Sequence, residues 1–206
     1  MADDVNPVAD VLLEFTQALI HHVITARGAY ADDGSRSTVY GVRLRAPPAS
    51  RRAEVEHFLE DCLSTLRAPL SSGVVRRVRI AFTREKRCVE AFAFDFALKK
   101  VPSPPSDALK AEVRAALTSL AMKFALVTED AGTRSPGGGG ELKWEVLAES
   151  DDDGRDEAPP NGWRRADDVK KGKIDRTCDV ENGEVVKIKS VSTAAFDAAL
   201  SLVVCR

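Results

Sequence analysis

Three stretches of the sequence repeat apolar residues every three or four positions, which is the spacing of an α-helix with one buried face. The first stretch follows Asn6 and Pro7, a pair typical of a helix start, and Gly28 suits the position after a helix end. Ser50 and Ser106 are the expected N-caps of the second and third helices, and Pro69 closes the second. The apolar positions of these three predicted helices are Val8, Val11, Leu12, Phe15, Leu19 and Val23; Val55, Phe58, Leu59, Cys62, Leu63 and Leu66; and Leu109, Val113, Leu117, Leu120 and Phe124.

Alternation of apolar with polar or small residues predicts strands between and after these helices. Residues 78–82 and 88–96 are expected to form a hairpin around a polar turn. In its second strand, Phe92, Phe94 and Phe96 fall on one face, and small residues fall on the other, which would let a helix pack closely there. Further extended segments are predicted over residues 38–45, 141–148, 185–191 and 196–204.

The order of these elements predicts an α+β domain, in which an antiparallel sheet carries helices on one side, because strands and helices do not alternate as in parallel folds. A chain of 206 residues suits one domain, with a core over about 7–148. Residues 149–162 are acidic and hold almost no large apolar side chains, so we expect an exposed, mobile loop. Residues 163–206 end in apolar, strand-like sequence, which predicts that the C-terminus docks onto the domain.

The composition argues against several classes of protein. The net charge is −2, whereas proteins that bind nucleic acid directly usually carry a basic excess, so a single-strand DNA-binding module is a weak alternative. The N-terminus lacks the features of a secretory signal, and no apolar run is long enough to span a membrane. The four cysteines form no CxxC pair, and we expect them to be reduced in an intracellular protein.

The sequence contains no recognisable catalytic or cofactor motif. The glycine run at 137–140 lacks the lysine and hydroxyl residue of a phosphate-binding loop, and the acidic loop lacks the ligand spacing of a calcium site. His21, His22 and His57 are interpreted as solvated or rim residues, with no nucleophile placed beside them. We therefore expect no catalytic residues, no metal and no cofactor, and an enzyme of unknown type is the remaining alternative from that class.

Several motifs, in their order and spacing, resemble proteins of the HORMA-domain family. The most recognisable is the Val-Glu-x-Phe-x-Phe pattern that begins at Val89. The matching segments are Val8–Phe15, Thr25–Tyr30, Val39–Val42, Val75–Phe82, Val89–Phe96 and Val185–Val191. Within the family, the start of the first helix and the run from Val89 look most like the accessory, non-catalytic subunits of DNA polymerase zeta. The spindle-checkpoint members are the alternative, since they share Tyr40 and Gly41 and a similar terminal strand.

The resemblance implies an adaptor rather than an enzyme. Its C-terminal segment, about 163–206, would be a safety belt that closes over a partner peptide added to the sheet as a strand. The implied ligand is a proline-containing segment of the polymerase zeta catalytic subunit, and a second surface would contact a Y-family scaffold polymerase in translesion DNA synthesis. The same resemblance implies a nuclear protein, with the cytoplasm as a second compartment, and a remodelling AAA+ ATPase as a further partner. For the checkpoint alternative, the ligands are peptides of mitotic regulators.

The resemblance also carries individual residues. Phe58 and Trp163 match aromatic positions of the peptide groove, although Phe58 also fits the apolar stripe of its helix. Trp144 is interpreted as a core residue of its strand. Three small residues match the second partner surface, where the family usually has larger side chains: Val185, Ala199 and Ser201.

A HORMA–HORMA dimer through the third helix is a further implication of the resemblance. Thr118 falls where the polymerase branch uses an arginine for this contact. Arg114 lies one turn earlier on the same helix. These two residues are the candidates for self-association.

Overall fold

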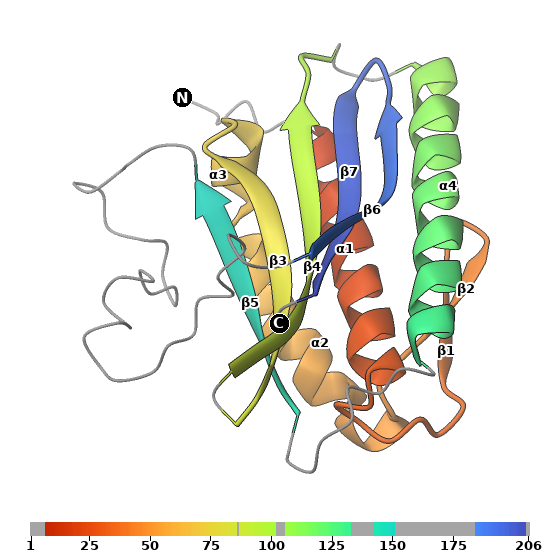
Figure 1. Ribbon diagram of the computed structural model, residues 1–206. Coiled ribbons are helices and arrows are strands. Elements are labelled where there is room, and N and C mark those ends of the chain that lie inside the picture. The colour runs from red at the N-terminus through yellow and green to blue at the C-terminus, as the bar shows by residue number, and fades with distance from the viewer. Residues whose placement is uncertain (1–6, 86, 102–105, 133–141, 151–183, 205–206) are drawn as a thin grey trace.

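The computed structural model describes residues 7–85, 87–101, 106–132, 142–150 and 184–204 (Figure 1). Trp163 and the predicted loop beyond residue 150 lie outside these ranges. The elements are α1 (Pro7–Ala26), β1 (Arg36–Val39), β2 (Val42–Arg45), α2 (Ala49–Ser64), α3 (Arg67–Ser71), β3 (Val75–Arg84), β4 (Arg87–Leu98), α4 (Asp107–Gly132), β5 (Lys143–Ser150), β6 (Glu184–Ser192) and β7 (Phe196–Val204).

A five-stranded antiparallel sheet in the order β5-β3-β4-β7-β6 forms one layer, and the helices cover one of its faces. Figure 1 shows α1, α2 and α3 behind the sheet and α4 beside its β6 end. The short hairpin β1–β2 forms a separate sheet that contacts α1 and α4. The predicted α+β architecture, with helices on one side of an antiparallel sheet, is confirmed.

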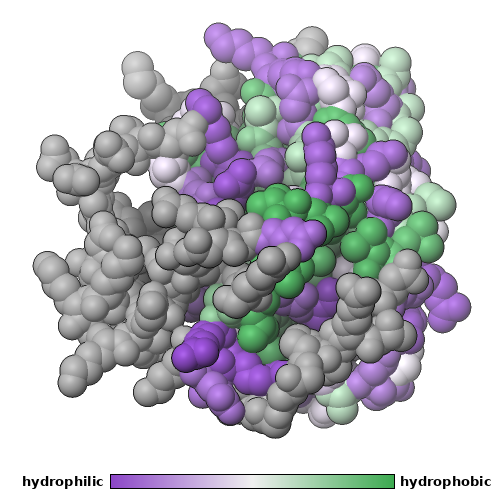
Figure 2. All heavy atoms as spheres, viewed as in Figure 1, coloured by the Kyte–Doolittle hydropathy of each residue, from purple (hydrophilic) through white to green (hydrophobic). Residues whose placement is uncertain are grey.

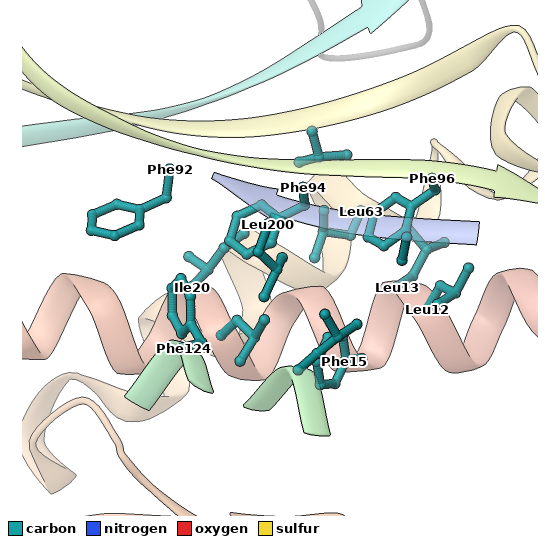
Figure 3. Packing of buried hydrophobic residues seen from close by; sticks show 14 of the residues in the cluster. Leu12, Leu13, Phe15, Ile20, Leu63, Phe92, Phe94, Phe96, Phe124 and Leu200 are labelled. Atoms are coloured by element: carbon teal, nitrogen blue, oxygen red, sulfur yellow. The ribbon is translucent and has the colours of Figure 1, made fainter. Parts of the chain in front are cut away.

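The alternation along β4 decides which face of the sheet carries the main core. Phe92 and Phe94 are fully buried and both contact the ring of Phe124 on α4, with centroids 5.5 and 5.9 Å away. Figure 3 shows Phe94, with Phe96 nearby, on the side of the sheet that faces α1. The expectation that a helix packs on the small-residue face is wrong. Bulky aromatic side chains bury more apolar area, so the helices cover the phenylalanine face instead.

The predicted helices are observed, with two differences at the second one. Ser50 lies inside α2 instead of capping it, because the carboxylate of Asp33 accepts a hydrogen bond from the Ala49 amide at 3.0 Å. Pro69 does not end the helical region but sits within the short helix α3. Ser106 does cap α4, since its hydroxyl accepts a hydrogen bond from the Leu109 amide at 3.2 Å.

The extended segment predicted over residues 38–45 is in fact the tight β1–β2 hairpin. Its turn residues Tyr40 and Gly41 have φ angles of 50° and 82°, a left-handed pair that suits a two-residue hairpin turn. Tyrosine seldom adopts this conformation, so alternation alone could not locate the turn. The Thr118 hydroxyl on α4 donates a 2.9 Å hydrogen bond to the Tyr40 carbonyl and holds it in place.

Strand β5 runs two residues further than predicted. Glu149 and Ser150, assigned from sequence to the acidic loop, belong to this strand. Glu149 forms ion pairs with Arg77 at 3.1 Å and with Arg79 at 2.5 Å on the adjacent strand β3. These cross-strand pairs explain why an acidic residue extends the strand.

Two of the three histidines are buried, which corrects their interpretation as solvated or rim residues. His22 is 1% exposed; its Nδ1 accepts a hydrogen bond from the Arg45 amide at 2.9 Å, so its Nε2 carries the proton and donates to the Thr128 hydroxyl at 2.6 Å. Burial and neighbouring arginines lower the pKa of His22 to about 4. Burial, followed by the charge of Arg52, lowers the pKa of His21 to about 4 as well. Only His57 matches its interpretation as a solvated residue.

A buried ion pair lies beside this network. Arg27 donates to the carboxylate of Glu90 at 2.5 Å and to the carbonyl of Thr128 at 3.2 Å, and its guanidinium lies over the ring of Phe92. The pair thus joins the end of α1 to β4 and to α4. Breaking such a pair on one side is costly, because the remaining charge stays buried without its partner.

Cys88 on β4 is disulfide-bonded, which contradicts the expectation that all four cysteines are reduced. Spacing in the sequence alone does not show which thiols come close together in the fold. Cys62 on α2 carries a free thiol, and burial raises its pKa.

The lowered histidine pKa values predict that stability falls in mild acid. The unfolded chain binds these protons below a pKa of 6.5, whereas folded His22 binds one only near 4. The free energy of unfolding should therefore decrease as pH falls from 6.5 to 4, by up to about 3 kcal/mol per histidine at the lower limit. Urea unfolding at pH 7 and pH 5 measures this dependence.

Comparison with His22→Gln isolates the contribution of this histidine. The raised pKa of Glu90 acts in the opposite direction, but it is present in both proteins. The variant should be less stable at pH 7 and should lose less stability than the wild type on going to pH 5. If both proteins lost the same unfolding free energy between pH 7 and pH 5, the lowered pKa of His22 would be contradicted.

Candidate functional site

The two edge strands of the sheet differ in how open they are to a further strand. Within the described ranges, β3 is the one strand that pairs with β5, so β5 is the last strand of the sheet on that side. At the opposite edge, β6 lies against α4 and is interrupted by a register shift between Lys187 and Lys189. Bulges and lysines are common devices that protect an edge from pairing. The edge of β5 is therefore the better candidate for strand addition.

Two aromatic side chains meet at this edge. Phe58 projects from α2 and is 46% exposed. Its ring contacts that of Trp144 on β5, edge to face, with 5.6 Å between centroids and 78° between planes. We call the outer side of β5 together with Phe58 and Trp144 the edge site.

The structure places Phe58 beside the edge strand β5 and changes the interpretation of Trp144. Trp144 packs against the core but is only half-buried, and among the described strands its own strand pairs with β3 alone. Alternation shows which face a residue occupies but not whether its strand is central or at an edge. Sequence reasoning therefore missed Trp144 as a site residue. Trp163 lies outside the described residues.

The side chains of β5 alternate between two different environments. Trp144, Val146 and Ala148 are opposite buried residues of β3 and face the helices. Glu145 and Glu149 point to the other face, where Glu149 pairs with arginines of β3. A strand added at this edge would meet aromatic rings on one face and acidic side chains on the other.

The three residues of the predicted second partner surface lie together on the helix-free face. Ala199 is opposite Ser190, Ser201 is opposite Lys187, and Val185 is opposite Val203 in the β6–β7 ladder. Val185 is 55% exposed. Figure 2 looks onto this face and shows hydrophobic residues gathered near its centre.

A shallow depression of about 710 Å³ includes Ala199 in its lining. It crosses the sheet from Glu149 and Arg77 to Asp95, Ala199 and Ser190. Arg77 lies between the carboxylates of Asp95 and Glu149. Its guanidinium is thus already engaged with two acids within the sheet.

The two candidates for self-association lie on the side of α4 that faces the β1–β2 hairpin. Thr118 is half-buried, and its hydroxyl is engaged with the Tyr40 carbonyl. Arg114 is exposed and, together with Tyr40, lines two depressions of about 610 and 410 Å³. Burial raises the pKa of Tyr40, and Glu14 acts in the same direction. Thr118 thus supports the hairpin turn, while the side chain of Arg114 is exposed.

The described residues form no cluster of three or more metal-binding side chains. Among the same residues, no helix is long and apolar enough to cross a membrane.

Comparison with solved structures identifies the fold. The chain aligns with one in the crystal structure of the mitotic checkpoint complex at a TM-score of 0.70 and 16% identity, covering 96% of this chain and 98% of that one. The structure of C. elegans HTP-2 bound to the HIM-3 closure motif aligns at a TM-score of 0.68 and 10% identity, covering 97% of this chain and 90% of that one. The structure of C. elegans HTP-1 bound to HTP-3 motif-1 aligns at a TM-score of 0.65 and 9% identity, covering 96% of this chain and 89% of that one. The chain thus has the HORMA fold expected from its motifs. No family model and no curated protein matches the sequence.

The contact between Phe58 and Trp144 can be tested with tryptophan fluorescence. The chain has two tryptophans, so Trp163→Phe leaves Trp144 as the single fluorophore. In that background, Phe58→Ala should shift the emission of Trp144 to longer wavelength and increase its quenching by acrylamide, because the ring that shields the indole is lost.

The same substitution should lower the free energy of unfolding by only about 1 kcal/mol, since Phe58 is half-exposed. Leu126→Ala, at an exposed leucine on α4, is the matched control and should leave the emission unchanged. An unshifted spectrum in Phe58→Ala would show that the two rings are not in contact in solution.

Proposed function

We propose that this protein is an adaptor that holds an extended peptide of a partner protein along the edge of β5. The observation that carries the proposal is the arrangement of the sheet. The hairpin β6–β7 lies on β4, and β5 has an edge with no strand partner in the described part of the chain. An added strand would gain main-chain hydrogen bonds from β5 and side-chain contacts from the edge site.

The connectivity supports enclosure of such a peptide. Because β5 and β6 are at opposite edges of the sheet, the chain between them has to cross four strand spacings, about 19 Å. In the proposal, residues 163–206 form a safety belt that passes over the peptide and ends in the β6–β7 hairpin. A ligand enclosed in this way would dissociate slowly, because the belt has to open first.

The edge site also suits a ligand that contains proline. In a strand added at an edge, every second amide points away from the sheet, so proline at such a position loses no hydrogen bond. A proline ring also offers a rigid apolar surface to Phe58 and Trp144. We therefore propose a proline-containing segment of the polymerase zeta catalytic subunit as the ligand, as the sequence motifs suggest.

The proposal extends to a second partner. Val185, Ala199 and Ser201 share the helix-free face and leave the edge of β5 open, so one molecule could hold both partners at once. In the proposed role, this face contacts a Y-family scaffold polymerase in translesion synthesis, which places the protein in the nucleus. A HORMA–HORMA dimer through Arg114 and opening of the belt by an AAA+ ATPase belong to the same proposal.

A spindle-checkpoint role is the second candidate. It is favoured by the alignment with a chain of the mitotic checkpoint complex, which covers 98% of that chain. In this case, the ligand would be a peptide of a mitotic regulator at the same edge site. The two candidates differ in the peptide and not in the mode of binding.

Peptide binding separates the two candidates. The purified chain would be presented with the proline-containing segment of the polymerase zeta catalytic subunit of its own organism, with a spindle-checkpoint ligand peptide, and with a scrambled peptide. We expect slow dissociation from the first peptide only. Trp144→Ala and Phe58→Ala should each accelerate dissociation by about tenfold or more, because both rings line the edge site.

Leu126→Ala is again the control and should bind as the wild type does. Retention of the checkpoint peptide alone would favour the second candidate and refute the polymerase assignment. Failure to bind either peptide would refute the proposed adaptor role.

A further inference from the structure

The turn between β6 and β7 is held in place by two other elements. Figure 1 shows this turn beside the first turns of α4. Lys99, just after β4, donates from Nζ to the Thr193 carbonyl at 2.7 Å and to Asp197 Oδ1 at 2.8 Å. On the other side, Glu112 of α4 accepts a hydrogen bond from the Ala194 amide at 3.0 Å. We call Lys99, Glu112 and Asp197, with the turn that they hold, the latch.

The turn between β6 and β7 is also held by hydrogen bonds of its own backbone. The Thr193 hydroxyl accepts hydrogen bonds from the Ala195 and Phe196 amides at 3.1 and 2.9 Å, and all three residues are buried. The Ala195 carbonyl also accepts from the Lys99 amide at 2.8 Å. The turn therefore presents one carbonyl and one amide in fixed directions, where Lys99 and Glu112 reach them.

The latch also has a favourable charge arrangement. The hydrogen bond from Lys99, and then that from Ser192, lowers the pKa of Asp197, so this carboxylate is charged at neutral pH. Hydrogen bonds between charged groups are stronger than neutral ones. Every latch contact requires the hairpin to lie on β4, so the latch is lost as soon as the hairpin leaves that position.

We propose that Lys99 and Glu112 are positioning residues that set how long a bound peptide is retained. This inference rests on the proposed function, in which the chain from β5 to β6 encloses the peptide. The hairpin anchors one end of that chain, and its detachment from β4 would release the ligand. Lys99 and Glu112 hold the turn of the hairpin, and through it they would act on the enclosed peptide.

Local opening sets the timescale of release. β7 pairs with β4 over nine residue pairs, from Glu90 and Val204 to Leu98 and Phe196. The latch lies at the end of this ladder that is next to the β6–β7 turn. If β7 begins to separate from β4 at the opposite end, near Val204, the latch must still break before the hairpin detaches. Contacts that hold a segment closed lower the population of its open state, and their loss speeds every process that passes through that state.

The test compares peptide dissociation from Lys99→Met, Lys99→Arg and the wild type. It is run with the full chain, its disulfide intact, and the peptide that the wild type retains. Lys99→Met should release the peptide about five- to tenfold faster, as expected for lost charge-assisted hydrogen bonds. Lys99→Arg keeps a cationic donor and should remain within about twofold of the wild type.

Arg67→Met is the matched control. Arg67 forms an ion pair with Asp10 that joins α3 to α1, with side chains 54% and 38% exposed, compared with 38% and 49% for Lys99 and Asp197. It does not contact the hairpin and should leave the dissociation rate unchanged. Equal rates for the wild type and Lys99→Met, or equal acceleration by Arg67→Met, would overturn the latch.

Hydrogen exchange in the free protein separates failure of the latch from failure of the proposed function. Lys99→Met should raise the exchange rate of the β7 amides paired with β4 by about five- to tenfold, as it does the rate of peptide release. The exchange rate of the β3 amides paired with β4 should remain unchanged. This result would support the latch even if no tested peptide bound to the wild type. Unchanged exchange along β7 would overturn the latch whatever the peptide does.

Discussion

The pairing of β7 with β4 is the constraint on which the rest of the structure depends. It makes β4 a central strand, bonded on one side to β3 and on the other to β7. It also carries the C-terminal hairpin to the side of the sheet opposite β5. If the hairpin lay along β5 instead, the edge site would be covered and no strand could be added there. A single choice of strand pairing therefore decides both where the chain ends and where a partner can bind.

The composition of β4 makes this arrangement stable. Its phenylalanines are buried against α1 and α4, and Ala91 on the opposite face packs with Ala81 and Val203 in a small second cluster. The buried pair Arg27–Glu90 and the bonds of His22 join α1, α4, β4 and the β1–β2 hairpin into one body. That body is rigid on the helix side. The edge of β5 and the helix-free face of β6–β7 are thus surfaces on a fixed scaffold, which is the arrangement expected for recognition without rearrangement of the core.

The sequence pattern predicts the long helices, the β3–β4 hairpin and the layered architecture, because each of these has a local period. It also points to Phe58, although only through a family resemblance. Features that depend on distant contacts could not be predicted. The burial of His22 requires Thr128 and Arg45, and the turn at Tyr40 is stabilised by Thr118. Trp144 looks like a core residue in any alternating strand, and only the sheet order shows that its strand is at an edge.

Amide hydrogen exchange along β5, with and without a bound peptide, tests the central claim most directly. In the free protein, the β5 amides directed away from β3 should exchange quickly, and those bonded to β3 slowly. Bound peptide should protect every second amide of β5 and leave the amides of β6 unchanged, since a new strand bonds only to the outward groups of β5. Protection confined to β6 or to the helices, with β5 unaffected, would contradict the account.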